Sequence, residues 1–134
     1  MDVLPGIECR TTWLPREPAS AALARAHIVD ACRAWGLDNI TPVAVLAASE
    51  LVTNSIIHTE SALVGVVAWR DGRRFSVEVR DSDPAPPILR TPTRADDHGR
   101  GLRLVAEMCD QWGVLPADDG DGKAVWFSIT GPIP

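Results

Sequence analysis

Residues 50–58 have the sequence Glu-Leu-Val-Thr-Asn-Ser-Ile-Ile-His and form the second half of a predicted helix that begins at about Pro42. Pro42 suits the first turn of a helix, and Thr41 before it is a good N-cap residue. Apolar residues occur almost all the way round this helix, so we expect it to be buried on several sides. Glu50 and Asn54 share one face with apolar residues, which makes them polar exceptions on a core helix.

Glu50 and Asn54 have the chemistry of a ligand site. An ionised carboxylate among apolar neighbours is costly unless it is paired or used. The two residues are four positions apart, so their side chains stack and can address one ligand. The amide oxygen of Asn54 suits Mg²⁺ beside phosphates, and a partly buried Glu50 suits a general base. The structural alternative is a Glu50–Asn54 hydrogen bond or a link to a neighbouring arginine. His58, four residues further on, is either a phosphate contact or a surface residue at the helix end.

A second polar exception follows in a predicted hairpin. The apolar run over residues 63–69 predicts a buried strand, and Asp71-Gly72 after it is a two-residue turn signal. The return strand alternates, and counting by twos from Phe75 brings Asp81 to the core-facing side. A carboxylate accepts hydrogen bonds and donates none, so Asp81 suits recognition of an amino group such as that of adenine. The alternative is that Asp81 caps backbone amides at the start of a loop.

The third feature is a long loop that ends in a glycine pair. Residues 81–98 contain four prolines and predict a loop of a length that is usually functional or disordered. It ends in His98-Gly99-Arg100-Gly101-Leu102, where a third helix is predicted to begin. Glycines expose backbone N–H groups, and helix N-termini attract phosphate. A glycine pair alone is weak evidence, but together with Glu50, Asn54 and Asp81 it predicts one shared nucleotide site.

The rest of the chain completes a two-layer arrangement. We predict an opening strand over residues 7–14, a helix over 19–35, the third helix ending before Gly113, and closing strands over 112–115 and 124–129. Helices grouped apart from a mainly antiparallel, mixed sheet indicate an α+β fold, a two-layer α/β sandwich with three helices on one face. The 134 residues are predicted to form a single domain over 1–134.

The composition narrows the class of protein. The net charge of −5 argues against direct nucleic-acid binding through phosphate neutralisation. The three cysteines form no metal-site or disulfide pattern, which favours small buried side chains and a cytoplasmic location. No stretch is predicted to approach the roughly 20 apolar residues needed to span a membrane, so we expect no membrane association.

Five segments together resemble a known superfamily. The chain is similar to the gyrase, chaperone, histidine-kinase and mismatch-repair (GHKL) ATPases, which share the Bergerat fold, and within them to the actinobacterial-type anti-sigma factor/serine-protein kinases. The similar segments are Glu50–His58 (the N box), Val79–Pro84 and Gly99–Val105 (the two glycine boxes), and Trp112–Val114 and Gly122–Phe127 (the closing strands). The family's first glycine box usually has the pattern Asp-x-Gly-x-Gly, whereas Asp83 and Ala85 replace its glycines here.

The resemblance implies an ATP- and Mg²⁺-dependent protein serine/threonine kinase that acts in transcription regulation. It would phosphorylate an anti-sigma-factor antagonist of the STAS type and sequester a sigma factor. Sigma binding and formation of a homodimer would use surfaces outside the ATP site, involving the predicted helix over residues 19–35. Glu50 would be the catalytic base and Asn54 the metal ligand; the nucleotide contacts would be Asn54, His58, Asp81, Gly99, Arg100, Gly101 and Leu102.

The altered glycine box keeps other functions open. Without those glycines the backbone approaches a base less closely, which favours a protein-interaction switch that binds nucleotide weakly and transfers no phosphate. A free-standing ATPase or a fragment of a histidine kinase is disfavoured, because the sequence has no phospho-acceptor helix and no second domain.

Overall fold

The structure, a computed structural model, describes residues 7–82, 101–116 and 122–130. In chain order its elements are β1 (Ile7–Pro15), α1 (Ser20–Ala34), the short 3₁₀ helix η1 (Asp38–Ile40), α2 (Thr41–His58), β2 (Leu63–Asp71), β3 (Arg74–Asp81), α3 (Gly101–Met108), β4 (Gln111–Pro116) and β5 (Lys123–Thr130). Every helix and strand that the sequence predicts is present in this order.

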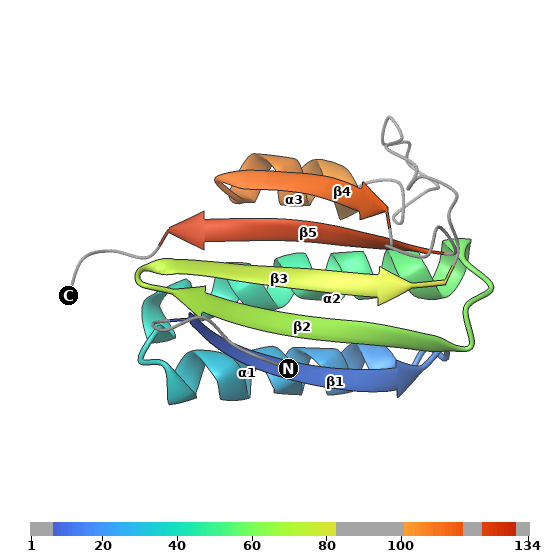
Figure 1. The fold of residues 1–134 in the computed structure, drawn as a ribbon, viewed down its shortest axis with the longest axis horizontal. Helices are drawn as coiled ribbons and strands as arrows, with labels where there is room; N and C mark the ends of the chain where they lie inside the picture. The colour runs from blue at the N-terminus through green and yellow to red at the C-terminus, as the bar shows by residue number, and fades with distance from the viewer. Residues whose placement is uncertain (1–6, 83–100, 117–121, 131–134) are drawn as a thin grey trace.

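The five strands form one sheet in the order β1-β2-β3-β5-β4, and all four pairings are antiparallel. The three α-helices cover one face of the sheet, and α2 lies between α1 and α3 (Figure 1). The predicted α+β class with two layers is therefore confirmed, but the described strands form an entirely antiparallel sheet in place of the predicted mixed one. Strand β3 lies at the centre, where its alternating residues Phe75, Val77 and Val79 are buried beneath the helices.

The β2–β3 turn lies one residue later than the sequence analysis predicted. Asp71 pairs with Arg74, so the two loop residues are Gly72 and Arg73. Gly72 has φ 61°, and Arg73, like every other described non-glycine residue, has a negative φ. Glycine at the first loop position with a positive φ is the pattern of a type II′ turn, whose twist matches that of the flanking strands. Asp71 is instead the last residue of β2.

Helix α2 is the central element of the helical layer. It contacts α1, α3 and strands β2, β3 and β5. Its buried residues are mostly small: Ala44, Ala47, Ala48, Leu51, Val52, Ser55 and Ile56. Small residues allow neighbouring elements to approach closely, and burial on several sides is confirmed.

The length and hydropathy of α2 correct one expectation from the sequence. By these two criteria alone, Asp38–His58 is apolar enough to cross a membrane, with a mean hydropathy of 1.5. The core helix of a soluble protein passes the same test, and α2 packs here between two helices and a sheet. The apolar character of this segment is explained by its position in the core.

The other face of the sheet carries two matched contacts between tryptophan and glycine. Trp13 of β1 is paired with Gly65 of β2, and a Cβ atom added to Gly65 would lie 2.7 Å from the Trp13 ring. Trp126 of β5 is paired with Gly113 of β4, where an added Cβ would lie 3.0 Å from the Trp126 ring. Each indole therefore covers the backbone of the neighbouring strand, in a space that only glycine leaves open.

Two of the three cysteines are the small core residues that the sequence predicts, whereas the prediction is wrong for Cys9, which is partly exposed. Cys32 and Cys109 are buried, and all three cysteines are free thiols. Burial and, to a smaller extent, the nearby Asp110 carboxylate raise the pKa of the Cys109 thiol to about 11. Burial also raises the pKa of Cys32, against a smaller opposing effect of a hydrogen bond with Thr41.

Alkylation of the folded protein at about pH 8 should therefore modify Cys9, which is partly exposed, well before Cys32 or Cys109. With a pKa of about 11, only about one Cys109 side chain in a thousand is the reactive thiolate at that pH. Peptide mass spectrometry after iodoacetamide treatment measures each site, and the denatured protein is the control. Equal rates at Cys9 and Cys109 in the folded protein would contradict this burial.

Candidate functional site

Asp81 is the buried charge at the end of the central strand. The alternation of β3 points it to the same side as Phe75, Val77 and Val79, as the sequence predicts. Only 1 % of its side chain is exposed. A carboxylate is normally kept in water, so this degree of burial requires partners of opposite charge or with N–H or O–H groups.

Two elements supply partners to Asp81. The Lys123 ammonium, at the start of β5, lies 3.1 Å from Oδ1, and 5 % of the lysine side chain is exposed. The Ser55 hydroxyl of α2 donates a hydrogen bond of 3.2 Å to Oδ2. Both carboxylate oxygens are therefore engaged, one by the neighbouring strand and one by the central helix. We call Asp81, Lys123 and Ser55 the buried polar cluster.

The sequence alone predicts no role for Lys123 or Ser55, although they lie within the segments Gly122–Phe127 and Glu50–His58. A signal for Lys123 existed, because it begins an alternating strand on the side of Val125 and Phe127, both of which are buried. A lysine on the apolar side of a strand needs a buried acid, and Asp81 is its cross-strand partner. What the sequence does not supply is the register between β3 and β5, which decides that Lys123 pairs with Asp81.

Further contacts fix the backbone on either side of Asp81. The backbone N–H and the hydroxyl of Ser82 both donate to Ser61 Oγ, at 3.0 and 2.9 Å. Gly122, which precedes Lys123, lies against the Asp81 carbonyl oxygen so closely that an added Cβ would overlap it. These contacts hold the end of β3 and the start of β5 against each other, so the carboxylate has a fixed position.

The predicted residues of α2 lie on the same helix as Ser55 of the cluster. Glu50, Asn54 and His58 are all partly buried, in keeping with the expectation of polar groups on a core helix. Asn54 directly precedes Ser55, the residue that contacts Asp81. Asp81 thus contacts the turn of α2 that contains Asn54, but it does so through Ser55, whose side chain lies on the neighbouring face of the helix. His58 lies one turn beyond Ser55 on a similar side.

Most of the predicted phosphate-binding segment lies outside the described residues. This applies to Gly99 and Arg100, and to Asp83 and Ala85 of the altered glycine box. Gly101 is the first residue of α3 and Leu102 the second, so the predicted helix start is confirmed. Helix α3 contacts α2, which places its N-terminal residues in the same layer as Asn54.

The donor set suits a nucleotide with its cation. Among the described residues there is no group of three or more His, Cys, Asp or Glu that could hold a metal by itself. Mg²⁺ beside phosphates needs only one or two protein oxygens, since phosphate and water supply the rest, and the Asn54 amide is such a ligand. A carboxylate accepts hydrogen bonds and donates none, which is the property that recognition of an amine requires.

Comparison with family models matches residues 14–129 to the histidine kinase-like ATPase domain. The chain belongs to this family. The match extends from β1 to β5 and includes α2, the buried polar cluster and α3. No curated protein matches the chain. Domains of this family bind ATP with Mg²⁺, so family membership supports an ATP-binding regulatory function and kinase-like chemistry.

Removal of one charge of the buried ion pair should lower the free energy of unfolding more than removal of a charge at the surface. Lys123→Met leaves the Asp81 carboxylate without its ion-pair partner, and each of Lys123→Met and Asp81→Asn should cost about 3–5 kcal/mol. The double variant removes both charges, so it should cost much less than the sum of the two. Urea unfolding followed by circular dichroism measures all three.

The exposed pair Glu8–Arg70, with N···O 2.6 Å, is the matched control. Glu8→Gln and Arg70→Met should each cost less than about 1 kcal/mol, because water screens exposed ion pairs. If Lys123→Met costs no more than Arg70→Met, or if the double variant shows simple additivity, the cluster does not hold the sheet end and the helix together.

Proposed function

We propose that this protein is an ATP-binding anti-sigma regulatory factor with serine/threonine kinase activity, of the anti-sigma factor/serine-protein kinase branch. It would phosphorylate a STAS-type antagonist and sequester a sigma factor. The observation that carries the proposal is the buried Asp81 carboxylate, which is fixed by Lys123 and by Ser55, the neighbour of Asn54. Family membership over most of the chain supports the nucleotide part of the proposal.

In this proposal each residue has a distinct task. Asp81 accepts a hydrogen bond from the amino group of adenine, and its burial excludes water that would compete for that bond. Asn54 offers its amide oxygen to the cation. ATP with Mg²⁺, when bound, supplies the phosphoryl group and the charge that neutralises it. The hydroxyl oxygen of the attacking serine or threonine bonds to the γ-phosphorus of ATP as the bond between that phosphorus and ADP breaks. Glu50 takes the proton that the hydroxyl loses.

One observation favours a second candidate, a protein-interaction switch that binds nucleotide weakly. Lys123 and Ser55 already engage both Asp81 oxygens, so adenine must share an occupied acceptor. The replaced glycines at positions 83 and 85 act in the same direction. The two candidates differ in nucleotide affinity and in phosphate transfer, and two experiments separate them.

The first experiment is calorimetric titration with ATP and ADP, with and without Mg²⁺. The kinase proposal expects saturable binding that strengthens with Mg²⁺. The double variant Asp81→Asn/Lys123→Met should bind at least about tenfold more weakly, because it replaces the charged acceptor for the adenine amine by a weaker neutral amide and leaves no unpaired charge in the core. Asp71→Asn, an exposed carboxylate at the opposite end of the hairpin, is the control and should bind like the wild type.

Absence of measurable heat at high nucleotide concentration would favour the switch. Binding that is unchanged in the Asp81→Asn/Lys123→Met variant, which remains folded by circular dichroism, would remove Asp81 from the adenine-binding role. GTP serves as a competitor that distinguishes recognition of the base from recognition of the phosphates.

The second experiment tests the proposed base with radiolabelled ATP and a purified STAS-type antagonist. Glu50→Gln should lower the rate of phosphate transfer by about 10²–10⁴-fold while nucleotide affinity stays close to that of the wild type. Glu60→Gln, an exposed glutamate beyond the end of α2, is the control. Transfer that continues at the wild-type rate in Glu50→Gln would exclude Glu50 as the base.

A further inference from the structure

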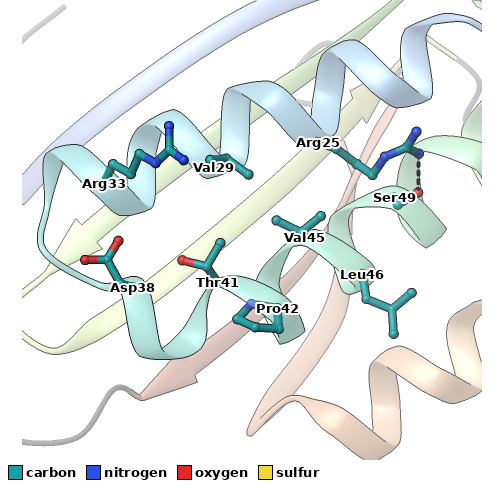
Figure 2. Close-up of a pocket in the computed structure, with 9 residues that line it drawn as sticks. All are labelled: Arg25, Val29, Arg33, Asp38, Thr41, Pro42, Val45, Leu46 and Ser49. Atoms are coloured by element: carbon teal, nitrogen blue, oxygen red, sulfur yellow. Dashed lines mark hydrogen bonds between the residues drawn. The ribbon is translucent and has the colours of Figure 1, made fainter.

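A groove lies between α1 and α2 on the side of the helical layer that faces away from the sheet (Figure 2). Its volume is about 640 Å³, and none of the residues predicted for the nucleotide site line it. The two helices run in opposite directions, so the Arg25 end of α1 lies beside Ser49 and the Arg33 end beside Thr41. The lining residues are Arg25, Val29, Arg33, Asp38, Thr41, Pro42, Val45, Leu46 and Ser49.

The middle of the groove is apolar. Val29 and Val45 are partly buried, and 43 % of Leu46 is exposed. Val29 and Val45 come from opposite sides of the groove, so they form a short apolar floor between the two helices. An amphipathic helix binds such a groove by placing its apolar face on the floor and its polar face toward water.

The ends of the groove are charged, and the charge is mainly positive. Arg25 and Arg33 are two helical turns apart on α1, about 12 Å along its axis. Arg25 donates a hydrogen bond of 3.1 Å to the Ser49 hydroxyl, which directs its guanidinium across the groove. A guanidinium has five N–H donors, so several remain for a partner. This positive charge contrasts with the net charge of −5 of the whole chain.

The two ends differ. Asp38 lines the groove at the Arg33 end, whereas no acidic residue lines it at the Arg25 end. A carboxylate from a partner therefore meets repulsion from Asp38 at one end and none from the lining at the other. Arg25 is the stronger anchor, and the asymmetry selects one orientation of the partner.

We propose that this groove binds an acidic amphipathic helix of a partner protein. That helix places aliphatic residues on Val29, Val45 and Leu46 and presents carboxylates about seven residues apart to the two arginines. This inference does not depend on nucleotide binding, because the groove and the buried polar cluster share no residue.

The test uses a synthetic, fluorescein-labelled peptide that forms an amphipathic helix. Leucines at helical spacing form its apolar face, and two glutamates about seven residues apart flank that face. Fluorescence anisotropy measures its binding to the full chain without ATP or Mg²⁺. We expect saturable binding that weakens with salt, and about tenfold weaker binding for Arg25→Glu. Arg33→Glu should have a smaller effect, and Leu46→Ser should weaken binding by removing apolar contact.

Matched controls make the result specific. Arg73→Glu makes the same charge change in the exposed β2–β3 turn and should bind like the wild type. A peptide with lysines in place of the two glutamates should bind Arg25→Glu more tightly than the wild type, which tests charge pairing even if the variant is slightly less stable.

Three outcomes would overturn the proposal: no saturable binding of the acidic peptide to the wild type, equal weakening by Arg73→Glu and Arg25→Glu, or binding that Leu46→Ser leaves unchanged but inorganic phosphate abolishes. The last outcome would indicate a small-anion site. Failure of nucleotide binding would leave this test unaffected, since ATP and Mg²⁺ are omitted.

Discussion

A carboxylate and an ammonium, both almost inaccessible to water, meet where β3 ends and β5 begins. Taking two such charges out of water is expensive, so the pair persists only because its geometry is good and Ser55 satisfies a further oxygen. The consequence is positional. The end of the central strand, the start of its neighbour and the last turns of α2 are held at one point, and that point lies within the part of the chain that matches the ATPase family.

Sequence patterns were sufficient for the secondary structure and for the layers. The alternation of β3 predicted the buried side of Asp81, and the apolar character of α2 predicted its central place, because both follow from the period of the element itself. The expectation that no stretch is long and apolar enough to span a membrane was wrong for a related reason: the composition of a core helix overlaps with that of a membrane span.

The pairing of Asp81 with Lys123 was beyond such reasoning. It depends on the register between strands whose paired residues are 42 positions apart in the chain, and a single sequence contains no local record of that register. The contact between Ser55 and Asp81 was equally beyond reach. Asn54 and Ile56 flank Ser55 in the chain but lie on different faces of the helix, and the sequence alone does not say which face meets Asp81. The groove between α1 and α2 also arises only when the two helices pack, since residues of both helices line it.

Helix α2 contributes to both surfaces. Ser49 and Val45 line the groove, whereas Ser55, nearly two turns away, contacts Asp81. A single rigid element thus carries a residue of the buried polar cluster on one side and part of the groove on the other. Its small side chains allow α1, α3 and the sheet to pack against it at the same time.

The two tryptophan–glycine pairs have a consequence for the borders of the sheet. An edge strand frays because its outer N–H and C=O groups have no neighbouring strand, and glycine adds conformational entropy to the unfolded form. Here the indoles of Trp13 and Trp126 shield the backbone of both border pairings, β1–β2 and β4–β5, on the side that no helix covers. Amide hydrogens next to Gly65 and Gly113 should exchange with solvent more slowly than their place near the rim would suggest.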